Sequence, residues 1–468
     1  MSKAAGLILG ALCACKPVHD TTQPMSPDSV APAARVASAG PVGSVDTAAT
    51  RQFAAWLDAF NSGDRAKLLE YHERHCSYSV VSEDIAGIDR EERLRNGTGG
   101  LDVKKVESRS ATSVAVTLKE RASDGFAQVE LSVVVADPER VERFAIHPIA
   151  TPDEFLTAEE RMARIVDGAR RRSLIDKATQ ALTAHYVFPD KAEEMNVALR
   201  RHLAAGDYDQ ITNAAAFAEA LTRDTREVSH DLHLGVRFGR RDTGPPPTSQ
   251  ELLDHARSIN FGFGVIERLQ GNIARVVIDG FPPTDNDVAR EAVGMLMTKV
   301  ADADALIFDL RENGGGQPLT VALVISYVFD STPVHINDMY SRETDSITES
   351  WTLRDVVGKR FGAKKPLYVL TSKRTFSGGE EFAYDLQSLH RAKIVGEITG
   401  GGAHPVSQHA LDDWFTIAVP WGRPINPITK TNWEGTGVVP DIAVSATAAL
   451  EEAHRRALAD VATAAASP

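Results

Sequence analysis

From Phe261 onward, short apolar segments alternate with amphipathic ones, and this alternation constrains the fold more than any other feature of the chain. The apolar segments predict strands at 271–281, 305–310, 366–372 and 393–397. The segments between them predict helices at 286–301, 317–328 and 378–391, and an Ala-rich amphipathic helix follows at 446–464. Strands that alternate with helices pair mainly in parallel, and the helices cover both faces of the sheet. We therefore predict an α/β domain.

Three of the predicted strands end in glycine-rich turns. The first turn lies in DLRENGGG, which ends at 314–316. The second precedes a helix in TFSGGEEF, where Ser377 occupies the first turn, and the third lies in GEITGGGAHP at 396–405. Binding sites of open α/β sheets gather at the carboxyl ends of the strands, and backbone N–H groups bared by glycine can bind an oxyanion. We expect the functional site at these turns.

Ser377 has two interpretations when its segment is taken alone. At a helix N-terminus its hydroxyl feels the positive end of the helix dipole, which favours a nucleophile. The pattern Ser377-Gly-Gly-Glu380 is equally a capping box, in which the serine only satisfies backbone amides. On this segment alone, the capping interpretation is the favoured one.

Histidines and a glutamate outside the three turns are further candidates. The segment SHDLHLGV carries His230 and His233, and NWEGTGVVPDI carries Glu434. A His-x-x-His pair suggests metal binding, but no carboxylate at a helical ligand spacing completes a zincin motif. We therefore predict neither a metal nor another cofactor.

The four motifs DLRENGGG, TFSGGEEFAYDLQ, VGEITGGGAHP and NPITKTNWEGTGVVPDI, in this order, resemble the tail-specific or C-terminal-processing peptidases of family S41. The resemblance extends over about residues 155–450. It is closest to the branch related to interphotoreceptor retinoid-binding protein and tricorn core domains. It implies an α/β fold with a ClpP/crotonase-like mixed sheet and a helical N-terminal subdomain, and it overturns the capping interpretation of Ser377.

The resemblance also implies roles for individual residues. Ser377 matches the nucleophile, and Glu380 matches the acid that follows it, a structural position. Gly314 or Gly315, together with Gly378, match the oxyanion hole, and Asp309 and Asn313 are expected to support it.

The residue expected to act as general base differs from that of the processing-peptidase branch. That branch places a lysine about 25 residues after the serine, where this chain has Gly402. The tricorn-like branch uses a histidine supported by a glutamate, and here His233 and Glu434 match, although a slip of three residues would select His230. Imidazole titrates near neutrality and can accept and return the hydroxyl proton. His404 and His409, near the third glycine turn, either line the site or are solvated loop residues, and we expect the latter.

The stretch between Gly235 and Phe261 is also too short for the PDZ module of processing peptidases. Recognition of substrate C-termini by such a module is therefore not expected of this chain.

The N-terminus predicts export. An apolar run from Ala4 to Ala14 is too short to span a bilayer but suits a signal peptide, and Leu12-Cys-Ala-Cys15 resembles a lipoprotein cleavage box with Cys15 lipidated. The Pro-, Ser- and Ala-rich stretch after it is typical of a flexible tether. The predicted organisation is a signal peptide at 1–15, a tether at 16–48, an α+β domain at 49–150, a helical subdomain at 151–240 and the catalytic α/β domain at 241–468.

The α+β domain begins with WLDAFNSGDRAKLLEY, which resembles the NTF2-like/SnoaL-like family, a match of low specificity. Its strands are predicted at 113–120, 127–135 and 143–149. No constellation of reactive residues occurs there, so we expect it to dock substrate or to dimerise.

Charge and cysteine content limit the partners. The formal net charge of −13 opposes binding to nucleic acid. After processing only Cys76 would remain, which allows no internal disulfide and no structural zinc site. We therefore expect a lipid-anchored serine peptidase of the cell envelope that acts on peptides or proteins and meets the membrane only through its lipid. The alternative is a non-catalytic binding protein that holds an apolar small molecule or a peptide in the same cleft.

Overall fold

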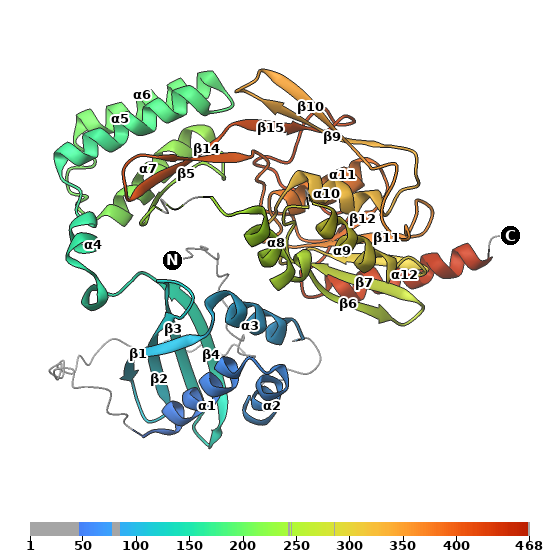
Figure 1. Cartoon of the computed structure of the whole chain (residues 1–468), viewed down its shortest axis with the longest axis horizontal. Helices are drawn as coiled ribbons and strands as arrows, with labels where there is room; N and C mark the ends of the chain where they lie inside the picture. Colours follow the sequence, from blue (N-terminus) through green and yellow to red (C-terminus); the bar gives the residue numbers. More distant parts are fainter. Residues whose placement is uncertain (1–45, 77–84, 242–243, 245, 285, 467–468) are drawn as a thin grey trace, which may run out of the picture. The chain divides into compact units, whose positions relative to one another are not determined.

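The computed structural model describes residues 46–76, 85–241, 244, 246–284 and 286–466. The chain forms two compact units, Met1–Thr157 and Ala158–Pro468 (Figure 1). The expected signal peptide, Cys15 and nearly all of the expected tether lie outside the described residues. None of the helices in the described ranges is sufficiently long and apolar to cross a membrane.

The first unit is an α+β domain. Its helices are α1 (Ala48–Ser62), α2 (Arg65–His75) and α3 (Ile85–Thr98), and a 3-10 turn, η1 (Asp153–Phe155), follows the sheet. Its strands form one antiparallel sheet in the order β1 (Leu101–Ser108), β2 (Ser113–Glu120), β3 (Phe126–Val134) and β4 (Asp137–Ile149). The core joins Trp56 and Phe60 of α1 to alternate residues of the strands. The resemblance to the NTF2-like family stays a prediction.

The second unit begins with a helical part. It comprises α4 (Ala158–Ala163), α5 (Gly168–His185), α6 (Pro189–Ala205), α7 (Ala214–Ser229) and the strand β5 (Gly235–Phe238). Strand β5 joins β14 (Phe415–Pro420) and β13 (Val406–Ala410) in a three-stranded antiparallel sheet. Helices α5, α6 and α7 pack with this sheet around Leu182, Phe217 and Phe415. A strand from the C-terminal part of the chain therefore completes the helical part.

The six-stranded sheet forms the centre of the second unit. Its strand order is β16 (Ile442–Ala443), β12 (Lys393–Gly396), β11 (Leu367–Thr371), β8 (Ala305–Asp309), β7 (Ile273–Ile278) and β6 (Phe263–Leu269). All neighbouring strands are parallel except β6 and β7. The α/β fold with a mixed sheet is confirmed.

Helices cover both faces of this sheet (Figure 1). One face packs against α8 (Ser249–Ser258), α9 (Asp287–Thr298), α10 (Pro318–Ser326) and α11 (Gly378–Ser388). The other packs against alanines of α12 (Ala449–Ala466). The alternation along β8 shows why: Leu306 and Phe308 point to the first face, and Ile307 points to the second.

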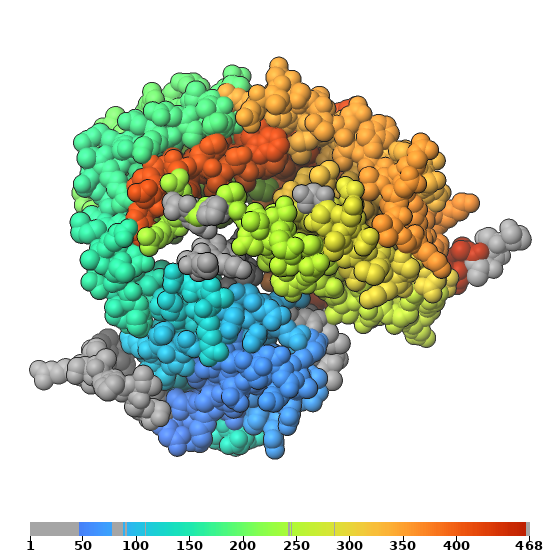
Figure 2. Space-filling view, viewed as in Figure 1, coloured from blue at the N-terminus to red at the C-terminus, as the bar shows by residue number. Residues whose placement is uncertain are grey.

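A third sheet was not predicted. Strands β9 (His335–Ser341) and β10 (Ser346–Trp351) form a hairpin, and β15 (Gly422–Ile425) pairs with β9. Elsewhere in the unit, a 3-10 turn, η2 (Asn260–Gly262), precedes β6 of the six-stranded sheet. Figure 2 shows the segment of β14 and β15, in orange-red, at the surface between the green helical part and the yellow-to-orange part. This segment connects the two parts of the unit, because β14 pairs with β5 and β15 with β9.

Candidate active site

Ser377 lies at the junction between the loop that follows β11 and helix α11, and it is half-buried. Its backbone has φ 53° and ψ −122°, a left-handed value that a non-glycine residue adopts rarely and at a cost. A strained turn from a strand into a helix is also how α/β hydrolases expose their nucleophile. The capping box of Ser377 and Glu380 is formed, but N-cap residues ordinarily adopt the β region, so capping alone does not require this backbone conformation.

The first glycine turn packs directly on Ser377. A Cβ atom added to Gly315, whose φ is +112°, would lie 2.7 Å from the Cβ of Ser377 and 3.0 Å from the amide nitrogen of Gly378. The Phe376 N–H donates to the Asn313 carbonyl at 3.0 Å. The turns after β8 and β11 thus meet, as their neighbouring parallel strands allow, and only glycine permits so close an approach.

Glu380 is fully buried and connects the nucleophile loop to the third glycine turn. Its Oε2 accepts the N–H groups of Ser377 and Gly402, each at 2.9 Å, and its Oε1 accepts the N–H of Gly401 at 2.6 Å and the hydroxyl of Thr399. Burial nevertheless raises the pKa of Glu380 above its ordinary value, because loss of water outweighs these donors. This carboxylate holds two of the three predicted turns together.

Asp309 and Asn313 organise the first turn. Arg275 and Arg311 both donate to buried Asp309, and these hydrogen bonds and charges lower its pKa although burial opposes them. Asn313 donates to the Ile278 carbonyl at 2.9 Å and accepts the N–H of Gly315 at 2.8 Å.

The backbone N–H of Gly315 already has an acceptor, the side-chain oxygen of Asn313. In the described part of the chain, the N–H groups of Gly314 and Gly378 have no acceptor. Of the two glycines expected for the oxyanion hole, Gly314 is the one whose amide is available to a ligand.

His233 reaches this site from the helical part. It lies two residues before β5, and the pairing of β5 with β14 positions its segment. Its ring centroid is 4.7 Å from that of Phe376, the residue before Ser377, and its Cε1 would be 2.8 Å from a Cβ added to Gly402. Its Nδ1 is buried without a hydrogen-bond partner, and burial lowers the pKa of His233 to about 4. The imidazole is therefore neutral at pH 7.

His230, the competing candidate, has another position. It ends helix α7 in a left-handed conformation with φ 57°, and its backbone N–H donates to the Arg226 carbonyl. Its side chain is exposed. The geometry favours His233 as the histidine of the site.

Glu434 lies near the same segment but holds backbone rather than the imidazole. Its Oε2 accepts the Ala403 N–H at 2.6 Å and the His404 N–H at 3.3 Å, and its Oε1 accepts the Leu232 N–H at 3.4 Å. Burial and the negative charge of Asp231 raise its pKa. No hydrogen bond joins Glu434 to the ring of His233 within the described residues.

The expectation that His404 and His409 are solvated was wrong. His404 is only 5% exposed, and its Nδ1 is 2.6 Å from Oδ2 of Asp231, which is itself 1% exposed. His409 lies in β13 and stacks on His185 with 4.1 Å between the ring centroids. Sequence reasoning missed Asp231 altogether, although Asp231 lies in the segment SHDLHLGV, two residues before His233.

Asp231, His404 and Glu434 offer ligand atoms within 4.8 Å of one another. Each of these side chains already has hydrogen-bond partners, since Asp231 pairs with His404 and Glu434 accepts backbone amides. The three side chains form a hydrogen-bonded network with the neighbouring backbone.

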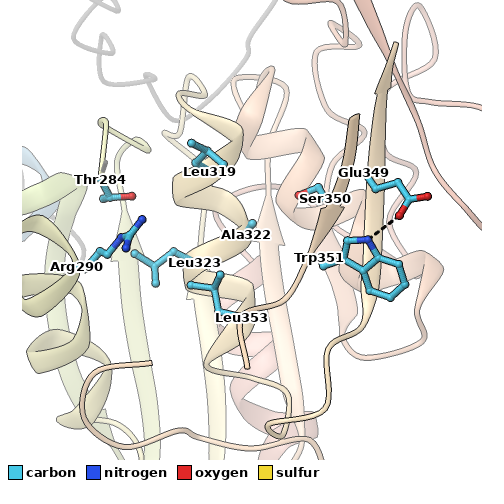
Figure 3. A pocket seen from close by; sticks show the side chains of 9 residues that line it. All are labelled: Thr284, Arg290, Leu319, Ala322, Leu323, Glu349, Ser350, Trp351 and Leu353. Carbon is cyan, nitrogen blue, oxygen red and sulfur yellow. Dashed lines mark hydrogen bonds between the residues drawn. The ribbon is translucent and has the colours of Figure 1, made fainter. Parts of the chain in front are cut away.

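A shallow pocket of about 270 Å³ opens elsewhere in the second unit, between the segment before α9, helix α10 and strand β10. Figure 3 shows Arg290 and Thr284 on one side, Leu319 and Leu323 of α10 between, and Trp351, which donates to Glu349, on the other. None of the candidate catalytic residues lines it.

In comparisons with known proteins, two family profiles match segments of the second unit. The profile described as peptidase family S41 matches residues 272–444, and the profile of the N-terminal domain of Peptidase_S41 in eukaryotic IRBP matches residues 168–258. The two matches together cover more than half of the chain.

Individual relatives are more distant. A tail-specific protease of Haemophilus influenzae is 35% identical over 119 residues, which are 24% of this chain and 15% of that protein. The structure of a lipoprotein from Streptococcus agalactiae is 14% identical with a TM-score of 0.43, and covers 62% of this chain and 96% of its own. The photosystem II D1 C-terminal processing protease is 15% identical with a TM-score of 0.38, and covers 63% and 98%. These two structural similarities support no inference about function.

Proposed function

Because the chain belongs to peptidase family S41, a family of serine-type peptidases, we propose that it cleaves peptide bonds through an acyl-enzyme formed on Ser377. The observation that carries this proposal is the strained backbone of Ser377 at the start of α11. It packs against the first glycine turn, and the ring of His233 lies in tilted contact with that of the preceding residue, Phe376. In support of the proposal, the same region of the described structure contains a serine hydroxyl, an imidazole and two glycine amides, those of Gly314 and Gly378, without an acceptor among the described residues.

In the proposed reaction, His233 accepts the hydroxyl proton as the Ser377 Oγ attacks the carbonyl carbon of the substrate. The amides of Gly378 and Gly314 stabilise the oxyanion of the tetrahedral intermediate. The C–N bond then breaks as the imidazolium returns the proton to the leaving amine. Water, deprotonated by the same imidazole, attacks the ester, and the second product leaves with its new carboxylate while Ser377 regains its proton.

Glu434 supports this site indirectly in the proposal. It accepts amides on both sides of the imidazole, from Leu232 in the segment of His233 and from Ala403 in the third turn. A buried carboxylate with such partners fixes the distance between the two segments. Its contribution is to orientation rather than to a direct bond with the ring.

Location follows from the N-terminal segment. We propose export, lipidation at Cys15 and attachment to the cell envelope, with peptides or proteins as substrates; the tail-specific protease among the relatives supports the substrate class. Incorporation of a labelled fatty acid that disappears in Cys15→Ser tests the anchor. An unlabelled wild-type chain in a bacterial host that lipidates a control lipoprotein would refute it.

The test of the activity is labelling of the purified chain with a fluorophosphonate probe, with the adduct located by mass spectrometry. We expect an adduct on Ser377, none in Ser377→Ala, and a strongly slowed reaction in His233→Ala. Peptide hydrolysis should follow the same order. If the folded wild type gives no adduct while a reference serine hydrolase reacts, the peptidase assignment fails, and binding of apolar ligands or peptides becomes the function to measure.

A further inference from the structure

Asp231 is a buried carboxylate two residues before the candidate base, and both of its oxygens accept hydrogen bonds. Its Oδ1 accepts the backbone N–H of His233 at 3.0 Å. Its Oδ2 accepts the Nδ1–H of His404 at 2.6 Å and the hydroxyl of Tyr186 at 3.3 Å. One carboxylate therefore joins the end of α5, the segment of His233 and the third glycine turn.

His404 lies between two carboxylates, that of buried Asp231 and that of half-buried Glu434. Its Nδ1 is 2.6 Å from Oδ2 of Asp231 and 3.5 Å from Oε2 of Glu434. Two carboxylates buried this close together repel each other unless a cation or strong donors compensate them. The Nδ1 atom of His404 is the side-chain donor that lies near both carboxylates.

We propose that Asp231 and His404 are positioning residues for His233: the His404–Asp231 pair holds segment 231–233 so that the imidazole lies against Phe376 and Gly402. This inference rests on the proposed role of His233 as the base. The proposed role requires no contact between either residue and substrate, because the pair acts on His233 through the backbone N–H of His233.

The same geometry predicts what fails without the pair. Arg226 also holds this segment, through the carbonyls of Leu232 and Leu234, so the strand β5 beyond it keeps its place. The N–H of His233 would lose its acceptor when Asp231 is removed. The imidazole would then turn out of its buried position and gain water.

The first measurement is the titration of the His233 ring by NMR in the full chain, which needs no activity. The titratable or charged groups that act on this ring are Asp231, His404 and Arg226. The charge of Asp231 raises the pKa of His233, so its loss alone would lower that pKa below about 4. Release of the ring into water instead raises the pKa toward 6.5. The two effects have opposite signs in Asp231→Ala.

We expect an upward shift of the titration in Asp231→Ala and a value that stays low in Asp231→Asn, which keeps an acceptor for the His233 N–H. The matched control is Asp224→Ala in the same helical part, because Asp224 is also buried and accepts a tyrosine hydroxyl, that of Tyr208, at 2.7 Å. It should lose stability without moving the titration. A downward or absent shift in a folded Asp231→Ala overturns the proposal.

Two variants of His404 provide a second test, which is still informative if Asp231→Ala does not fold. His404→Asn keeps an N–H donor near the position of Nδ1, and His404→Leu removes it. We expect the labelling rate of Ser377 and kcat to fall about tenfold to a hundredfold in His404→Leu, the range that loss of an orienting partner costs at metal-bound histidines. KM should stay unchanged, and His404→Asn should recover most of the loss.

The outcomes separate the two proposals. If the wild type is neither labelled nor active but the His233 titration shifts as described, the peptidase assignment fails and the positioning of His233 stands. If the wild type is active and His404→Leu, correctly folded, matches it in rate and titration, the positioning role is refuted while the peptidase assignment is kept.

Discussion

The imidazole of His233 occupies the space beside Gly402: a Cβ atom there would lie 2.8 Å from Cε1 of His233 and 2.2 Å from Cζ of Phe376. The resemblance to processing peptidases places their lysine at this position in the chain. In this chain no side chain fits at 402, because the aromatic ring and the imidazole already fill the volume that its first carbon would need. In this chain, a histidine from a distant segment lies beside Phe376 and Gly402, where position 402 itself offers no side chain.

The first prediction concerns this contact. Gly402→Ala should lower the free energy of unfolding by about 1–3 kcal/mol, because overpacking forces Phe376 and His233 to move, and should reduce the labelling of Ser377 at least tenfold. Chemical denaturation and labelling kinetics measure the two effects.

A double variant with Phe376→Leu tests the cause. Shortening residue 376 makes room for the methyl group, so stability should partly return. Activity should stay low, since the Cβ still meets His233. Full recovery of activity in the double variant would show that the contact with His233 is unimportant.

The second prediction compares two adjacent glutamates of α11. Glu380→Gln leaves at least one buried backbone N–H facing an amide NH2 group, because the carboxylate accepts backbone amides on both oxygens. We expect a loss of about 1–3 kcal/mol of stability and a larger loss of labelling, since the backbone of Ser377 and the third turn both relax. Glu381→Gln is the matched control and should be labelled at the wild-type rate; equal rates in both variants would contradict the role of Glu380.

The third prediction concerns pH and activity. Because burial lowers the pKa of His233 to about 4, the neutral base should be available from about pH 5 upward. The value of kcat/KM, or the labelling rate, should therefore change little between pH 5.5 and 7 and fall below pH 4. A midpoint near 6.5 would mean that the imidazole is solvated.

The fourth prediction concerns stability and the same group. Between pH 6.5 and 4 the unfolded chain binds a proton at His233 that the folded chain does not, so stability falls as the pH falls. Relative to His233→Gln, the wild type should lose about 3 kcal/mol across this window, at about 1.36 kcal/mol per pKa unit. Denaturant titrations at both pH values measure it, and a difference that is independent of pH would contradict the buried neutral ring.

The fifth prediction concerns the buried pair Glu381 and Asp385. Both are buried on α11, and burial raises the pKa of Glu381 to about 7 and that of Asp385 well above its ordinary value. Asn337 donates to the first and Asn426 to the second. Stability from such a group is present below pH 4.5 and lost as the pH rises through about 7. The stability of Glu381→Gln relative to that of the wild type should therefore rise from pH 5 to pH 8. A stability difference that is the same at both pH values would refute this.

Local patterns were sufficient for much of the fold. Periodicity predicted β8 and β11 almost to the residue, because each is a short apolar run between turns. The hairpin β9–β10 escaped prediction, since all of β10 except Ser350 is exposed and the strand carries no apolar alternation. The glycine turns were read correctly as strand exits, but the use of the Gly315 amide by Asn313 required coordinates.

The sequence by itself determined the alternation of strands and helices in the central sheet from β7 to β12, the position of Ser377 at the start of a helix, and the motifs that carry the S41 resemblance, because all of these depend on residues close together in the chain. Only the tertiary structure decided which histidine meets Phe376, that His404 is buried, and that Asp231 joins them. Asp231 and His404 are 173 residues apart. Their side chains can form a hydrogen bond only after β5 pairs with β14. No local sequence pattern therefore indicates that these two residues are partners.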